Sequence, residues 1–252
     1  MLKTMKYEII RNKLTLIILA SILGAAELVF LFGIIGDNTR FVGYGILLLV
    51  LGTSVVYFAI WLLGLMSYSH DLRDKTGYMV FLTPISTYKI IFSKMLVGLF
   101  ELIISAILFI ILAGIDLKIL LSKYSSEASI VEAAARILNT STDDIMAAFF
   151  SFVVSLVFSV LMFYSFAYLA ASISALLSRK NGVQRVYSVV IIIIMLIIHS
   201  GINKALPKLD ANTGSIFINN MIENIPSYIL SLFFAAICTF ACGYLLDKKI
   251  SL

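Results

Sequence analysis

Six apolar runs, each long enough to cross a lipid bilayer as a helix, dominate the sequence. A membrane-spanning helix needs about 20 predominantly apolar residues, and helices satisfy their backbone hydrogen bonds internally within lipid. Charged residues make up only 13% of the chain, about half the fraction usual for a soluble domain. We therefore expect an all-α integral membrane protein with one transmembrane domain over residues 1–252. The expected spans are residues 14–36, 43–68, 89–115, 146–178, 186–202 and 227–246.

The first thirteen residues have the pattern of an amphipathic helix. Leu2, Met5 and Ile9 favour one face, and basic residues occupy the others. We expect residues 1–13 to form an interfacial helix on the membrane surface. A signal peptide is the competing interpretation, but the apolar run that follows is long, contains Glu27 and has no convincing cleavage site.

Local signals predict the shorter elements between the spans. Ser129 and Glu132 have capping-box spacing, which predicts a small helix over residues 130–138. Acidic residues after Thr142 suit the start of the fourth span, which is longer than a bilayer requires and should tilt or protrude. Asn181-Gly182 is expected to form a turn, and residues 203–226 are expected to form short re-entrant or interfacial pieces.

The distribution of basic residues predicts the orientation. With six spans, thirteen of the nineteen Lys and Arg residues fall on one side. Because basic residues concentrate on the cytoplasmic side, we expect both termini and the segment between the second and third spans to be cytoplasmic.

That segment, residues 70–94, is the most informative stretch of the chain. Its charges indicate a water-exposed location, and proline at position 84 interrupts any helix. We expect a short helix over residues 74–82, a break at Thr83-Pro84 and a new helix that begins around Ser86 or Thr87. A short surface helix with exposed aromatic residues suits docking to another protein; an ordinary interfacial hairpin is the alternative.

The stretch resembles the cytoplasmic loop after the second span of ABC-2 type permeases, the membrane subunits of ATP-driven exporters. The resemblance lies in acidic residues, Thr76-Gly77, an apolar patch at 79–82, Thr83-Pro84-Ile85-Ser86, and Lys94. Family members often have a Glu-rich lead and the order Gly-Thr, whereas this chain has Asp and Thr-Gly. The six-span layout extends the resemblance over nearly the full length.

The resemblance implies a bacterial-type cytoplasmic membrane protein that docks on an ABC ATPase subunit through a coupling helix. ATP and Mg would bind to that partner, and a second permease copy or a paralogue would complete the transporter. The substrate would be hydrophobic or amphipathic, with a peptide as the first expectation. The expected ATPase-coupling residues are Asp71, Arg73, Asp74, Lys75, Thr76, Gly77, Tyr78, Phe81, Leu82 and Pro84.

Two acidic residues are expected within spans, Glu27 in the first and Glu101 in the third. A charge at the bilayer centre costs about 2.5–3.5 kcal/mol, so such residues usually face protein or water. Their positions in the predicted spans place both at similar depth. They either line a cavity that contacts a cationic or polar substrate group, or form protonated carboxyls bonded to Ser or Tyr of a neighbouring helix.

Polar residues also follow the fourth span. Ser151, Ser155 and Ser159 are spaced four apart, which allows close helix packing. A polar pathway wall is the alternative to packing. The candidate pathway residues are Glu27, Glu101, Ser155, Ser159 and Tyr164.

The sequence contains no recognisable catalytic motif, nucleotide-binding loop or metal-ligand cluster, so we expect a non-enzymatic chain without bound cofactor or nucleic acid. Cys238 and Cys242 are expected to be packing residues, His70 a solvated loop residue and His199 an interfacial polar tip.

A substrate-capturing subunit of a vitamin importer is the second hypothesis for the function, although the charged stretch after the second span argues against it. An intramembrane enzyme is the third and would require Glu27 and Glu101 to face each other.

Overall fold

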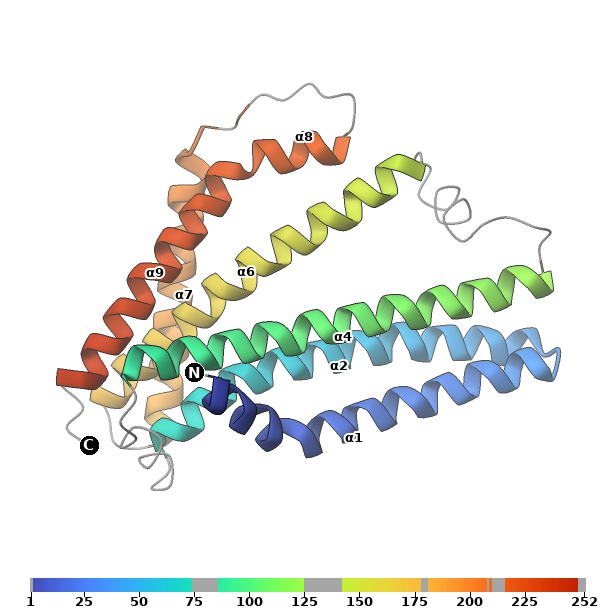
Figure 1. Ribbon diagram of the computed structural model, residues 1–252, viewed down its shortest axis with the longest axis horizontal. Helices are drawn as coiled ribbons and strands as arrows, with labels where there is room; N and C mark the ends of the chain where they lie inside the picture. Colours follow the sequence, from blue (N-terminus) through green and yellow to red (C-terminus); the bar gives the residue numbers. More distant parts are fainter. Residues whose placement is uncertain are drawn as a thin grey trace. The chain divides into compact units, whose positions relative to one another are not determined.

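The computed structural model describes residues 2–73, 86–124, 142–177, 181–207, 209 and 216–248. Regular structure in these residues is entirely helical, as Figure 1 shows. The helices are α1 (Leu2–Ile35), α2 (Thr39–Arg73), α4 (Thr87–Tyr124), α6 (Thr142–Leu177), α7 (Asn181–Ala205), α8 (Ile216–Glu223) and α9 (Ile225–Lys248).

Six of these helices, all except α8, are long and apolar enough to cross a membrane. The predicted all-helical class and the six spans are therefore confirmed. The first three spanning helices are longer than expected, with 34, 35 and 38 residues. At about 1.5 Å per residue each measures roughly 50 Å or more, which exceeds a hydrocarbon core of about 30 Å. Each must therefore tilt or extend beyond the hydrocarbon.

The N-terminal segment is continuous with the first span. Residues 2–13 and the apolar run that follows form one helix, α1, which bends in its N-terminal part (Figure 1). Helical structure over this segment agrees with the prediction. Its location on a membrane surface stays a prediction.

A tight connection joins α1 to α2. Asp37 has a φ of 51°, and the amide of Asn38 donates to the carbonyl of Gly33 at 3.1 Å. This is the left-handed C-terminal cap that usually employs glycine. The side chain of Asn38 then accepts a hydrogen bond from the amide of Arg40 at 3.1 Å, so it caps the N-terminus of α2.

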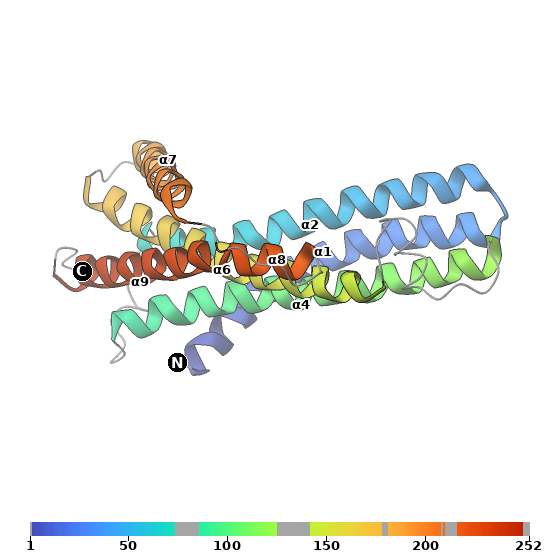
Figure 2. The ribbon, with the colours of Figure 1, turned by 90° about the horizontal axis from the view of Figure 1, so that it is seen from above.

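The chain divides into two compact units, and the boundaries between them fall within α2 and α4. The N-terminal unit comprises Leu2–Gly64 and Leu96–Ile130, and the C-terminal unit comprises Leu65–Met95 and Val131–Leu252. In the N-terminal unit, α1, α2 and α4 lie side by side (Figure 2). Its core cluster consists of Phe30, Ile34 and Val42, against which Leu31, Leu49, Ile119 and Leu120 pack.

Two glycines allow α1 and α2 to approach closely. A Cβ added to Gly33 would lie 2.6 Å from the backbone nitrogen of Val42, and one added to Gly45 would lie 2.5 Å from the Cα of Phe30. Small residues at such positions are typical of membrane helix contacts, because they let the backbones meet.

In the C-terminal unit α6 is the central helix, and it packs against α7, α8 and α9. Pro226 lies in the first turn of α9, where a missing backbone N–H costs nothing. Helix α8 confirms that residues 203–226 contain a short ordered piece; whether it is re-entrant or interfacial stays a prediction.

Two local predictions are wrong. Asn181-Gly182 is not a turn, because α7 begins at Asn181 and includes both residues; Asn and Gly are also tolerated where a helix starts. His70 is exposed but lies within α2 rather than in a loop. The helix predicted over 130–138 falls outside the described residues.

Candidate functional site

The predicted coupling stretch is described only at its two ends. Asp71 and Arg73 lie in the last turn of α2, and α4 begins at Thr87, as predicted. The amide of Lys89 donates to the carbonyl of Ser86 at 2.9 Å, which places Ser86 at the N-terminus of α4. The other predicted coupling residues lie outside the described residues; they are Asp74, Lys75, Thr76, Gly77, Tyr78, Phe81, Leu82 and Pro84.

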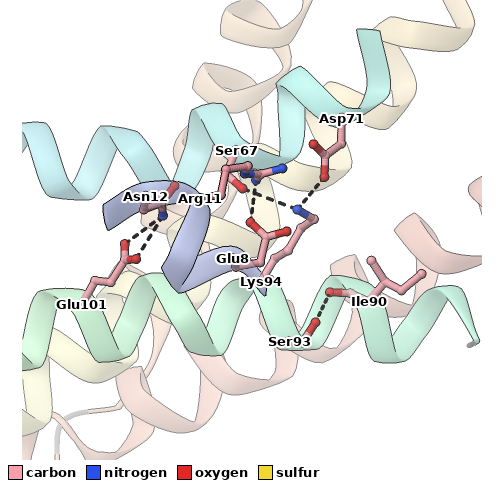
Figure 3. A network of polar contacts seen from close by, with 9 residues as sticks. All are labelled: Glu8, Arg11, Asn12, Ser67, Asp71, Ile90, Ser93, Lys94 and Glu101. Carbon is pink, nitrogen blue, oxygen red and sulfur yellow. Dashed lines mark hydrogen bonds and ion pairs between the residues drawn. The ribbon is translucent and has the colours of Figure 1, made fainter. Parts of the chain in front are cut away.

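A buried ion pair joins the two helices that flank this stretch. The Lys94 ammonium lies 2.6 Å from a carboxylate oxygen of Asp71, and the two side chains are 2% and 4% exposed. Lys94 also donates to the hydroxyl of Ser67 at 3.4 Å. Figure 3 shows Lys94 reaching from α4 to both partners on α2. The end of α2 and the start of α4 are therefore held together directly beside residues 74–85.

The start of α4 is also attached to the end of α9. The hydroxyl of Thr87 donates to the carboxylate of Asp247. The ring of Tyr88 lies against Gly243 without room for a Cβ, and its centroid is 5.6 Å from that of Phe240. These contacts place the C-terminal end of α9 beside the start of α4.

A buried polar cluster connects α2, α6 and α9. The Tyr68 hydroxyl lies 2.5 Å from the hydroxyl of Ser172 and 3.0 Å from the Cys242 sulfur, and all three side chains are fully buried. Cys242 is thus a packing residue, as predicted, with hydrogen-bonding partners that the sequence did not reveal. Both cysteines are free thiols.

The predicted pathway residues of α6 occupy different environments within the C-terminal unit. Tyr164 is fully buried, with its ring 6.1 Å from that of Tyr168. Ser155 hydrogen-bonds the hydroxyl of Tyr228 at 2.7 Å, which joins α6 to α9, whereas Ser159 is exposed. The contacts of Ser155 and Tyr164 agree with the packing interpretation, and a pathway role stays a prediction.

His199 lies between aromatic rings of α6 and α9. Its ring centroid is 6.1 Å from that of Phe166 and 5.6 Å from that of Phe234. The hydroxyl of Ser231 lies 3.4 Å from its Nε2. His199 therefore takes part in interhelical packing, beyond the role of an interfacial tip.

Glu101 has an amide partner rather than the expected Ser or Tyr. The side-chain amide of Asn12 donates to both of its carboxyl oxygens, at 3.0 and 3.2 Å (Figure 3). Asn12 and Glu101 are 8% and 9% exposed. Within α1, Arg11, the residue before Asn12, lies 2.5 Å from the carboxylate of Glu8, one turn earlier. This polar network joins α1 to α4 inside the N-terminal unit.

Glu27 lies beside a second carboxyl, Asp116. One oxygen of each, Glu27 Oε2 and Asp116 Oδ1, is buried without a hydrogen-bond partner among the described residues. Asp116 was expected outside the third span, but it lies within the apolar helix α4. Glu27 thus has a carboxyl neighbour rather than the expected Ser or Tyr.

Helices α1 and α4 run parallel with a constant register. Asn12 contacts Glu101, Glu27 contacts Asp116, and the Lys123 ammonium donates to the carbonyl of Ile34; each pair is 89 positions apart. Glu27 and Glu101 are therefore separated by about 22 Å along the helix axes, since fifteen residues rise about 1.5 Å each. The prediction that they share one depth is wrong.

Both acidic residues nevertheless line the same groove of the N-terminal unit. The groove has a volume of about 610 Å³ and lies between α1, α2 and α4. Apart from Lys13, Glu27, Glu101 and Ser105, its walls are apolar. A groove of this size is within the range that holds a small molecule or a single hydrocarbon chain.

Comparisons of the chain with protein-family models, curated proteins and solved structures give no match.

Proposed function

We propose that the chain is the membrane permease subunit of an ATP-driven exporter of the ABC-2 type. The observation that carries this proposal is the buried Asp71–Lys94 ion pair. It joins the two helices on either side of the stretch whose sequence resembles the coupling loop of such permeases, and both of its residues belong to that resemblance.

The ion pair gives the proposed coupling a physical route. A force applied to residues 74–85 by a closing ATPase dimer would act on α2 and α4 together, because Asp71 and Lys94 hold the ends of these helices in contact. The contacts of Thr87 with Asp247 and of Tyr88 with Gly243 extend the connection to α9. Motion of the loop would thus be transmitted to three spanning helices rather than absorbed locally.

The proposed partners follow from the same account. ATP and Mg bind to the ATPase subunit, and a second permease, identical or paralogous, completes the complex. The basic-residue distribution supports cytoplasmic termini in a bacterial-type plasma membrane. The predominantly apolar groove supports a hydrophobic or amphipathic substrate, with an amphipathic peptide as the preferred class.

Affinity purification from the native membrane tests this function. A tagged copy of the chain, expressed at its natural level and extracted in mild detergent, should co-purify an ATPase with a phosphate-binding loop in stoichiometric amount. An unrelated six-span protein carrying the same tag is the control. Recovery of the intact chain without any ATPase, before and after chemical cross-linking in the membrane, would contradict the proposal.

A further inference from the structure

The groove of the N-terminal unit has two features that together identify an occupant. Apart from Lys13, Glu27, Glu101 and Ser105, its walls are formed by apolar side chains of α1, α2 and α4, and Lys13 is an exposed cation. We propose that it binds one acyl chain of an anionic phospholipid, with the phosphate at Lys13. This inference does not depend on the export function.

The groove is open to the hydrocarbon rather than enclosed. Ile17 and Ile104, which line it, are 55% and 56% exposed. Both belong to helices that are apolar enough to cross a membrane. A lipid chain can therefore enter sideways from the bilayer, which a water-soluble ligand cannot do.

Charge at the Lys13 end favours a phosphate. Lys13 makes no hydrogen bond or ion pair with any described side chain, whereas the neighbouring charged groups are engaged. Arg11 pairs with Glu8, and both oxygens of Glu101 accept from Asn12. Lys13 is therefore the group at this end whose charge is available to a ligand, and a phosphate complements it.

The part of the groove between Lys13 and Leu23 matches one leaflet in length. Ten residues of helix separate Lys13 from Leu23, a rise of about 15 Å, which is half the thickness of a hydrocarbon core of about 30 Å. With its phosphate at Lys13, the terminal part of an acyl chain would lie beside Leu23 and Gly24, both of which line the groove.

Gly24 allows the groove to be filled without disturbing the protein. A Cβ added there would meet no atom within 4 Å, so Gly24→Leu places an apolar side chain in the space of the lipid. Gly114 is a matched control: it lies on α4, it also has open space around it, and it does not line the groove. Both substitutions favour the helix by removing a glycine.

The experiment uses the full chain in phosphatidylcholine vesicles that contain a small fraction of phosphatidylglycerol with a diazirine near the end of one acyl chain. After irradiation, labelled peptides are identified by mass spectrometry. Label should concentrate in residues 20–27 and 108–112, which line the groove beside the end of the acyl chain. Gly24→Leu should remove most of it, and Gly114→Leu should leave it unchanged.

A second arm tests the headgroup. Lys13→Gln should reduce labelling by phosphatidylglycerol roughly fivefold, the factor expected for one lysine near an anionic lipid, and should change labelling by a phosphatidylcholine probe much less. Lys118→Gln, at an exposed lysine on α4 outside the groove, is the control.

Three results would overturn the proposal. Labelling that survives Gly24→Leu would show that the acyl chain of the lipid binds elsewhere on the protein. Equal loss for both headgroups in Lys13→Gln would show that the groove does not select an anionic lipid, because phosphatidylcholine carries the same phosphate. Disulfide-linked dimers of Gly24→Cys, made with Cys238→Ala and Cys242→Ser, would show that a second copy covers the groove instead.

Discussion

The carboxylate of Asp71 and the ammonium of Lys94 lie 2.6 Å apart, almost completely buried, between the last turn of α2 and the first turns of α4. The ion pair thus holds the end of α2 and the start of α4 together. Removing one member of such a pair leaves the other as an uncompensated buried charge, whereas replacing both by apolar residues does not.

Single substitutions of this pair should therefore be more damaging than the double one. Lys94→Met or Asp71→Leu alone should destabilise the protein by about 3–5 kcal/mol, and the double variant should recover most of that loss. Thermal unfolding in detergent, followed by circular dichroism, measures the effect. If the double variant is as unstable as the sum of the single ones, the two side chains do not compensate each other.

The register of α1 against α4 predicts which positions can be cross-linked. In a background of Cys238→Ala and Cys242→Ser, a short bifunctional thiol reagent should bridge cysteines at Glu27 and Asp116, and likewise at Asn12 and Glu101. It should not bridge cysteines at Glu27 and Glu101, which are about 22 Å apart along the helices. Efficient bridging of that last pair would contradict the parallel register.

Close packing of α1 on α2 predicts opposite effects at neighbouring glycines. Gly45→Ala places a Cβ 2.5 Å from the Cα of Phe30 and should destabilise the N-terminal unit by about 1–3 kcal/mol. Gly43→Ala meets no atom within 4 Å, and should be neutral or stabilising by up to about 1 kcal/mol.

The fluorescence of Trp61, the single tryptophan of the chain, reports unfolding of this unit. Equal unfolding midpoints for the Gly45→Ala and Gly43→Ala proteins would show that Gly45 does not mark a close helix contact.

The sequence was sufficient to predict the six spans and several helix starts, because apolar length and capping residues are local properties. Thr87 and Thr142 begin helices where the sequence indicated. The partners of Glu27 and Glu101 could not be predicted, because they depend on the register between helices that are far apart in the chain. The predicted third span, residues 89–115, ends just before Asp116, yet Leu117, Ile119 and Leu120 continue the apolar pattern beyond it.

The distribution of basic residues predicts the orientation in the membrane. In the same cysteine-substituted background, cysteines placed at Ser126 and Asn212 should react with an impermeant thiol reagent added outside intact cells. A cysteine at Asn181, at the start of α7, should react only after permeabilisation. Reaction of the Asn181 position in intact cells would reverse the proposed orientation and move residues 74–85 away from any cytoplasmic partner.

The rate of ATP hydrolysis by the purified complex, measured with the amount of ATPase retained on the permease, tests the proposed function most directly. Tyr78 and Phe81 are the proposed aromatic anchors, and each should contribute about 2 kcal/mol or more to docking, whereas Lys75 at the rim should contribute little. The combined Tyr78→Ala and Phe81→Ala substitutions should therefore abolish most of the association and the hydrolysis that depends on it. Lys75→Ala should leave both near the wild-type level. If the double variant retains wild-type association and hydrolysis, residues 74–82 are not the coupling helix and the exporter proposal loses its main support.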